Sequence, residues 1–422
     1  MKSMKVPFSP PDMSEEEAKE VREAILSGWI TTGPRTKKLE AQISEYVGTP
    51  KTVCLSSATA SMEMVLHLLD IQPEDEVIVP AYTYTATASV TQHVGCRLVM
   101  VDSQKDNVEM DYEQLEQAIT EKTKVIMPVD IAGIVADYDR VYEIVERKKS
   151  LFKPANALQA KIGRVVVAAD CAHAFGAVRK GKKTGAITDF SAFSFHAVKN
   201  FTTAEGGALT WNLPFGNEIV PTDVDYMPTV PKTEGETWNE MLYRISQLFS
   251  LHGQNKDALA KTKGGMWEYD IIGPWYKCNM TDIMASLGLV QMRRYPKMLE
   301  RRQEIVARYN AALDGLNVAV LNHKDAEHCS SHHLYMVRLP GKSREEVNRV
   351  MEQMAERGIA TNVHFKPLPM MTAYKALGFD IADYPNAYHL FENEITLPLY
   401  TRLTDEEVDY VITNFVDIIK NL

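Results

Sequence analysis

Short apolar runs alternate with amphipathic stretches between residues 50 and 210, and this alternation predicts the fold class. The runs that carry continuous apolar character and predict strands are Lys51–Leu55, Glu76–Val79, Arg97–Val101, Lys124–Val129, Arg164–Ala169, Asp189–Phe195 and Ala208–Trp211. The stretches with a helical period between them are Ala60–Leu69, Tyr84–His93, Tyr112–Thr120 and Tyr138–Lys149. Strands that are apolar without alternation are typical of sheets buried on both faces. The pattern therefore predicts an α/β fold with a mostly parallel seven-stranded sheet flanked by helices.

Three aspartates follow predicted strands directly. Asp102, Asp130 and Asp170 each stand at the carboxyl end of such a run. Ligands of open α/β sheets bind beyond the carboxyl ends of the strands. We therefore expect a polar site at this edge of the sheet.

The alternation of predicted strands and helices ends after residue 211, and a different pattern follows. Prolines make 212–232 irregular, and a helix is predicted over Thr237–Leu251, so the region around 212–250 is interpreted as an insertion over the sheet. Two helices are predicted next, over Met280–Arg294 and Leu299–Leu313. The C-terminal pattern then predicts two strands, Leu334–Leu339 and Ala360–His364, and two helices, Arg344–Glu356 and Asp405–Ile419. We expect a large domain over residues 1–298 and a smaller α+β domain over residues 299–422.

Composition and charge exclude several functional classes. The chain has 422 residues, a net charge of −10 and a pI near 5.6, and it has no Lys/Arg-rich block, which argues against nucleic-acid binding. The five cysteines are scattered and form no C-x-x-C pair, as is usual in a reducing compartment. No signal-peptide pattern and no apolar run of transmembrane length is present, so we expect a cytoplasmic protein without a membrane partner.

One lysine stands in a segment that favours covalent chemistry. Lys199 follows the predicted strand Asp189–Phe195 and lies among hydroxyls and glycines, including Ser194 and the pair Gly206-Gly207. Burial at a strand end disfavours the ammonium form, and a neutral lysine amine forms a Schiff base with a carbonyl-bearing cofactor. Ser194, Thr202 and Thr203 are candidates for a phosphate, and the two glycines allow a close approach to a flat ring. The alternative is a surface lysine on a loop.

Three further segments are compatible with pyridoxal 5′-phosphate (PLP) as that cofactor. Asp170 can hold the ring nitrogen protonated, and His173 can reach the ring from one side. The segment Ser57-Ala58-Thr59 opens a helix after a strand, which is a typical anion site. Tyr84 can stack on a planar ring. Each has an ordinary structural alternative: helix capping for Asp170 and the Ser57 segment, and core packing for His173 and Tyr84.

In this order, the segments resemble the DegT/StrS family of PLP-dependent nucleotide-sugar aminotransferases, which has the type I fold of aspartate aminotransferase. The resemblance extends over nearly the whole chain and rests on these segments: Gly28–Pro34, Ser57–Thr59, Pro80–Tyr84, Asp170–His173, Ser194–Gly207, Tyr276–Asp282, Asn362–Pro367 and Leu397–Tyr400. Two residues depart from the family pattern. Ala58 replaces the usual glycine of the phosphate loop, and Cys278 stands where an aromatic residue is frequent.

The resemblance implies a role for each matching position. It makes Lys199 the residue that carries PLP covalently and shuttles the proton. It assigns cofactor contacts to Ser57, Ala58, Thr59, Tyr84, Asp170, His173, Ser194 and Lys277, and substrate contacts to Thr32 and His364. Lys277 would reach the phosphate from the other subunit of a homodimer with shared active sites. The substrates implied are a nucleotide-linked keto-sugar and an amino-acid donor, L-glutamate, in surface polysaccharide or amino-sugar biosynthesis. No metal is implied.

Three other functions stay open at the level of sequence. Sugar dehydratases of the same family replace the lysine by histidine, and Lys199 is present here. A non-catalytic regulatory protein would not need Lys199, Asp170 and a stacking aromatic residue together. An enzyme for free amino acids would bind the substrate carboxylate with an arginine of the small domain, for which Arg402 is a candidate.

Overall fold

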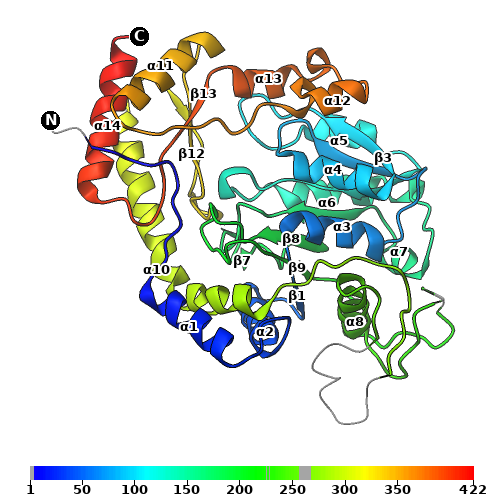
Figure 1. The fold of residues 1–422 in the computed structure, drawn as a ribbon. Coiled ribbons are helices and arrows are strands. Elements are labelled where there is room, and N and C mark those ends of the chain that lie inside the picture. Colours follow the sequence, from blue (N-terminus) through cyan, green and yellow to red (C-terminus); the bar gives the residue numbers. More distant parts are fainter. Residues whose placement is uncertain (1–3, 225, 228, 256–267) are drawn as a thin grey trace.

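A seven-stranded sheet forms the centre of the computed structural model, which describes residues 4–224, 226–227, 229–255 and 268–422 (Figure 1). Its strands are β1 (Thr52–Leu55), β2 (Glu76–Pro80), β3 (Arg97–Val101), β4 (Thr123–Ile126), β5 (Val166–Asp170), β8 (Phe190–Ser194) and β9 (Gly207–Trp211). Their order across the sheet is β1-β9-β8-β5-β4-β2-β3, and β9 alone runs antiparallel to its neighbours. The predicted mostly parallel α/β sheet is confirmed.

Helices cover both faces of this sheet, which explains the apolar character of its strands. The helices of this part of the chain are α1 (Glu15–Leu26), α2 (Pro34–Val47), α3 (Ala58–Leu68), α4 (Thr85–Val94), α5 (Tyr112–Ala118), α6 (Tyr138–Arg147), α7 (Ala157–Ile162) and α8 (Trp238–Ser250). Successive strand residues point to opposite faces, so Val77 and Val79 join the core under α3 and α8, while Ile78 joins the core under α2 and α6.

The helix predicted within the 212–250 region is part of the main core. The apolar side chains of Trp238, Leu242 and Ile245 on α8 are buried in the same cluster as those of α3. The helix also contacts β1. The segment therefore covers one face of the sheet near its β1 edge.

A second core lies in the C-terminal part of the chain. Its sheet has the order β10-β12-β13, formed by β10 (Ala319–Val320), β12 (Tyr335–Arg338) and β13 (Glu394–Leu397). The helices α11 (Arg344–Glu356) and α14 (Asp405–Lys420) pack on it together with the end of α10 (Asp282–Leu313). Apart from Val6, the buried residues of this core lie between 305 and 418, which supports the division that we propose near residue 299.

Two short helices of the C-terminal part pack elsewhere. Side chains of α12 (Thr372–Ala376) and α13 (Pro385–Glu392), such as Tyr374 and Leu390, belong to the core of the large sheet. A small third sheet, β11-β6-β7, joins β11 (His328–Cys329) to β6 (Val178–Arg179) and β7 (Lys182–Lys183). Both features connect the two parts of the chain.

Two predicted elements differ from the structure. The two helices expected over 280–313 form the single helix α10, which continues through Pro296. The predicted strand Ala360–His364 is not formed: Ile359 and Asn362 make only isolated bridges, to Val6 and to Thr396. Among the described residues, no helix is long and apolar enough to cross a membrane.

Candidate active site

A cavity of about 390 Å³ opens at the carboxyl ends of β5 and β8, where the aspartates predicted a polar site. The predicted site residues that line it are Ser57, Ala58, Thr59, Tyr84, Asp170, His173, Ser194, Lys199 and His364. Phe8 and His333 line it as well, although the sequence did not indicate them, and so does Phe365 of the matching segment Asn362–Pro367. The structure thus gathers residues from both parts of the chain around one space.

Lys199 lies in the cavity wall in a turn after β8. Its backbone N–H donates to the carbonyl of His196, at 2.9 Å, which fixes the turn. Burial lowers the pKa of its amine to about 8, and the nearby Asp170 carboxylate opposes this shift without cancelling it. An amine with this pKa is partly neutral near neutral pH and is a nucleophile.

Asp170 ends β5 and is fully enclosed. Its Oδ2 accepts a hydrogen bond from the Thr87 hydroxyl at 2.7 Å, and its Oδ1 accepts one from the Ala172 N–H at 3.0 Å. Burial raises the pKa of this carboxyl, against the effect of both hydrogen bonds and of Lys199. The ionised form of such a buried carboxylate is stabilised most by a cationic ligand group that donates a hydrogen bond to it.

Burial lowers the pKa of three of the imidazoles that line the cavity. These are His173, His333 and His364, which are therefore neutral near pH 7. His173 accepts a hydrogen bond from the Ala132 N–H at Nδ1, at 3.2 Å, so its proton is on Nε2. Its ring lies 4.5 Å from that of His333 and stacks on Phe365 at 5.9 Å between centroids.

The predicted anion site is the N-terminus of α3. Ser57 is the N-cap and accepts a hydrogen bond from the Ala60 N–H at 3.0 Å. Its hydroxyl thus caps the helix, and the first backbone N–H groups and the helix dipole remain available to an anion. Gly207 of β9 packs directly against this loop: a Cβ there would lie 2.3 Å from the Ser57 carbonyl carbon and 2.5 Å from the Ala58 nitrogen. The glycine is therefore needed for the approach of β9 to the loop, and its close contact with a flat ring stays a prediction.

Only one of the three hydroxyls considered for a phosphate reaches the cavity. Ser194 lines it, whereas Thr202 and Thr203 are buried and donate to the carbonyls of Phe195 and Glu205. Tyr84 is 61% exposed at the cavity, with its ring 6.1 Å from that of Phe365. Its face is thus free for a planar ligand.

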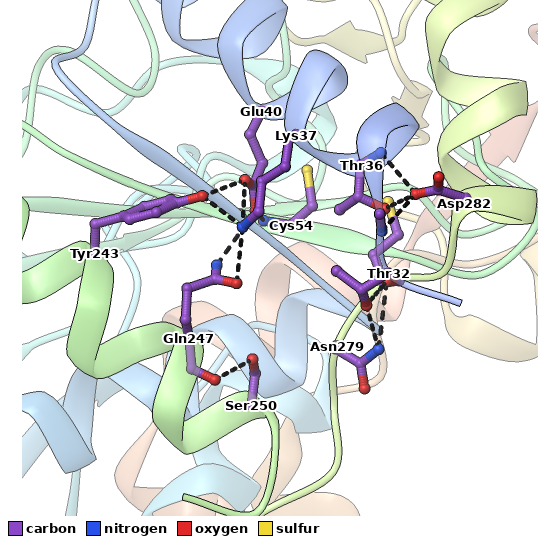
Figure 2. A network of polar contacts seen from close by, with 12 residues as sticks. Thr32, Thr36, Lys37, Glu40, Cys54, Tyr243, Gln247, Ser250, Asn279 and Asp282 are labelled. Carbon is purple, nitrogen blue, oxygen red and sulfur yellow. Dashed lines mark hydrogen bonds and ion pairs between the residues drawn. The ribbon is translucent and has the colours of Figure 1, made fainter. Parts of the chain in front are cut away.

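Thr32 and Lys277 lie together, away from the lining of this cavity. The Lys277 amine donates to the side-chain oxygen of Asn279, and the Asn279 amide donates to the Thr32 hydroxyl. The Thr32 hydroxyl donates in turn to the carbonyl of Met280 at 2.5 Å. Figure 2 shows Asn279 beside Thr32 and Asp282 beside Thr36. Two predicted site residues thus form a separate cluster, in which Lys277 is exposed.

Asp282 anchors this cluster to the start of α2. Its Oδ1 accepts from the N–H groups of Gly33 and Thr36 at 2.8 and 2.9 Å, and its Oδ2 accepts from the Arg35 N–H at 3.1 Å. A carboxylate at this end also interacts favourably with the helix dipole. Asp282 therefore fixes the loop that carries Thr32 (Figure 2).

Some residues of the site were not predicted. Thr87 lies in the predicted helix Tyr84–His93, and its position about one helical turn after Tyr84 was the available signal. His333 carries no motif that would have indicated it. Arg402, the candidate for a substrate carboxylate, is exposed and does not line the cavity. Among the described residues, no cluster of three or more His, Cys, Asp or Glu side chains is arranged to hold a metal.

Comparisons with known proteins agree with this geometry. The profile of the DegT/DnrJ/EryC1/StrS aminotransferase family matches residues 11–416. A Streptococcus pneumoniae protein assigned as a sugar aminotransferase, solved in its PMP form, is 55% identical, with 99% of each chain covered and a TM-score of 0.90. Its PLP form is 53% identical, with the same coverage and TM-score.

Two more distant proteins are also similar over their whole length. The spore coat polysaccharide biosynthesis protein SpsC of Bacillus subtilis is 33% identical over 424 residues, which cover 98% of this chain and 97% of SpsC. The structure of Helicobacter pylori PseC, an aminotransferase in the biosynthesis of pseudoaminic acid, is 25% identical, covers 99% and 100% of the two chains and has a TM-score of 0.83.

Proposed function

Because the chain belongs to the DegT/DnrJ/EryC1/StrS aminotransferase family, we propose that it transfers the amino group of L-glutamate to the keto group of a nucleotide-linked sugar. It is a PLP-dependent sugar aminotransferase; the amino donor and the nucleotide are the proposed parts. The observation that supports the proposal most strongly is the shared cavity of Lys199, Asp170 and the N-terminus of α3.

The residues of the cavity fit PLP. Asp170 offers a buried carboxylate to a protonated ring nitrogen, and Thr87 and Ala172 hold its two oxygens in place. Ser57, Ala58, Thr59 and Ser194 would hold the phosphate, since the N-terminus of α3 binds an anion. Tyr84 and His173 would contact the two sides of the ring. The bound cofactor supplies an electron-withdrawing ring that favours loss of the proton from the α-carbon of the donor.

Lys199 performs the proton transfer in this proposal. Its Nζ would hold the cofactor covalently, and its amine would be free for proton transfer once the donor is bound. This amine, with a pKa lowered to about 8 by burial, would take the proton from the donor α-carbon. It would return the proton to the cofactor carbon that receives the amino group. Lys199 carries out the same transfer in the reverse sense when the keto-sugar is the substrate.

A homodimer with shared active sites completes the proposal. Lys277 and Thr32 lie in the cluster outside the cavity of their own chain, and exposed apolar side chains, Ile30 and Tyr276, lie beside them in the sequence. A second copy placed on this surface would bring Lys277 to the phosphate and Thr32 to the substrate of the partner. Such an isologous arrangement gives two equivalent sites.

The polysaccharide role is proposed from the relatives. SpsC is named for spore coat polysaccharide biosynthesis, and PseC for the biosynthesis of pseudoaminic acid. We propose that the product of this enzyme is likewise an amino-sugar precursor of a surface polysaccharide, made in the cytoplasm.

The proposal is tested by following both half-reactions separately. The purified enzyme is first converted with L-glutamate and freed of excess donor, and a panel of keto-sugars with and without a nucleotide is then added. We expect the nucleotide-linked keto-sugars alone to restore the PLP absorbance. Restoration by 2-oxoglutarate alone, with no response to any sugar, would contradict the proposed acceptor.

A further inference from the structure

His364 is held in the cavity wall by three hydrogen-bonding contacts. Its backbone N–H donates to Oε2 of Glu394 at 3.0 Å, and its carbonyl accepts from the Tyr82 hydroxyl at 2.5 Å. Its ring nitrogen Nδ1 lies 2.9 Å from Oγ1 of Thr396. The ring therefore has a fixed position, with Nδ1 toward β13.

The contact with Thr396 continues to a buried acid. Oγ1 of Thr396 lies 2.5 Å from Oε1 of Glu394, and both side chains are fully buried on β13. Glu394, Thr396 and His364 thus form one continuous hydrogen-bonded chain. Because Nδ1 is engaged by Thr396, Nε2 is the ring nitrogen that can serve a ligand in the cavity.

The Thr396 hydroxyl carries a single proton, so this chain has two possible directions. When Glu394 is ionised, the hydroxyl donates to it, and Thr396 must then accept the proton of His364 Nδ1. Nε2 in that case is an acceptor. When Glu394 is protonated, it donates to Thr396, whose hydroxyl donates to Nδ1, and Nε2 carries the proton.

We propose that Glu394, acting through Thr396, determines which ring nitrogen of His364 carries the proton, and so whether Nε2 accepts or donates a hydrogen bond to the substrate. Glu394 and Thr396 are positioning residues in this inference. The consequence for the substrate rests on the proposed function, in which His364 contacts the sugar. The direction of the hydrogen-bond chain does not rest on it.

The environment of Glu394 allows its carboxyl group to titrate near neutral pH. Burial raises the pKa of Glu394 to about 8, against the hydrogen bonds from Thr396 and the His364 N–H and against the Arg344 guanidinium on α11. Arg344 donates from Nη1 to the Glu394 backbone carbonyl at 2.7 Å. The hydrogen bonds to the Glu394 carboxylate come from the Thr396 hydroxyl and the His364 N–H.

The other polar groups near this carboxylate come from neighbouring elements. Arg338 stands opposite Glu394 on β12 and is paired with Asp106 at 2.7 Å, while Tyr82 donates to the His364 carbonyl. Burial and the nearby Lys199 lower the pKa of His364 to about 3, so its ring stays neutral. A proton on Glu394 therefore changes the tautomer of His364 and leaves its charge unchanged.

The substitution E394Q separates the two directions. The His364 N–H can only donate, so the amide oxygen of the glutamine must face it. The amide NH₂ group must then donate to Thr396, whose hydroxyl donates to Nδ1. We expect E394Q to keep the proton of His364 on Nε2 at every pH, as in the protonated wild type.

Nitrogen-15 NMR of histidine-labelled holoenzyme tests this directly, with H364N used to assign the ring. We expect the wild-type His364 signals to change from the Nε2–H to the Nδ1–H pattern as the pH rises through about 8. E394Q should keep the Nε2–H pattern. The variant T396V should remove the pH response, and T396S should restore it. Retained PLP absorbance shows that each variant is folded.

A His364 tautomer that is the same in the wild type above and below pH 8 would overturn the inference. So would an E394Q variant that still titrates like the wild type. Should E394Q fail to fold, the wild-type titration together with T396V and T396S decides the same question, since only the hydroxyl distinguishes T396S from T396V in the chain.

Kinetics of the two half-reactions give the consequence for the substrate. Both half-reactions depend on Lys199. The effect of its titration therefore cancels in the ratio of kcat/KM for the keto-sugar to kcat/KM for the donor. We expect this ratio to change about tenfold across pH 8 in the wild type, which is the effect of one hydrogen bond, and to be independent of pH in E394Q.

Two outcomes separate the inference from the proposed function. If no sugar reacts but the NMR result holds, the proposed function fails and the relay formed by Glu394, Thr396 and His364 stands. If sugars react with the same ratio in both proteins, the relay has no role in binding the substrate, which overturns that part of the inference.

Discussion

The hydroxyl of Thr87, in the first turn of α4, donates a 2.7 Å hydrogen bond to Oδ2 of Asp170 at the end of β5. This contact holds the buried carboxylate that we assign to the ring nitrogen of PLP. It also couples the helix after the aromatic residue Tyr84 to the centre of the sheet.

The isosteric variant T87V removes this donor and leaves Asp170 with one hydrogen bond from the backbone. Because the carboxylate is buried, its ionised form becomes less stable, and we expect PLP to bind about tenfold more weakly. A titration of the apoenzyme with PLP measures the effect. T91V is the matched control, since Thr91 is buried on the same helix and donates to the carbonyl of Ala88. Equal losses in T87V and T91V would contradict a specific role for Thr87.

Much of this site could be predicted from the sequence, because its main residues follow strand ends. Asp170 and Lys199 both follow apolar runs, and the parallel sheet brings the ends of such runs together. His333 could not be predicted, because its place in the cavity depends on how the C-terminal segment packs on the large sheet. The strand predicted over Ala360–His364 does not form, because Asn362 pairs with Thr396 of β13 only by an isolated bridge and side chains of β13 bind His364.

The continuity of α10 was missed for a different reason. Pro296 lies between the two predicted helices, and proline removes a backbone donor within a helix. The structure continues the helix through it, with Tyr295 and Met298 buried on either side of the proline. The burial of these side chains outweighs the lost hydrogen bond.

The pH dependence of PLP capture by the apoenzyme should report the pKa of Lys199. Burial lowers this pKa to about 8, and the protonated amine, which predominates below it, is unreactive. We expect the rate constant for formation of the lysine-bound cofactor to rise about tenfold per pH unit below pH 8 and to level off above it. Stopped-flow absorbance measures the rate. A rise that continues to pH 10 would show an amine of ordinary pKa and contradict the effect of burial.

The shared active sites predict complementation between two inactive variants. K199A lacks the nucleophile, and K277A lacks the proposed phosphate contact to the partner subunit. In a mixture that exchanges subunits, half of the dimers are mixed, and each of these has one intact site, so we expect about a quarter of the wild-type activity. Each variant alone is the control. A mixture no more active than the separate variants would show that Lys277 does not act on the partner.

The cap formed by Asp282 should contribute strongly to stability. D282A removes the acceptor for three backbone N–H groups at the start of α2 and for the Thr36 hydroxyl. We expect the free energy of unfolding to fall by about 3 kcal/mol, because these donors are left without a charged acceptor in a buried place. Chemical denaturation of the protein measures it. The comparison is S343A at the exposed N-cap of α11, which should cost about 1 kcal/mol. A smaller loss for D282A than for S343A would contradict the account of this loop.

The central claim is that Lys199 carries PLP and transfers the amino group of a donor. The measurement that tests it most directly is the visible absorbance of the purified protein before and after addition of L-glutamate, beside the same experiment on K199A. We predict an absorption band of lysine-bound PLP that disappears with glutamate as the cofactor takes up the amino group, and that a nucleotide-linked keto-sugar restores. K199A should bind PLP without this band and should not turn over. A wild-type protein that stays colourless when PLP is added, or a K199A variant that completes many turnovers, would contradict the claim.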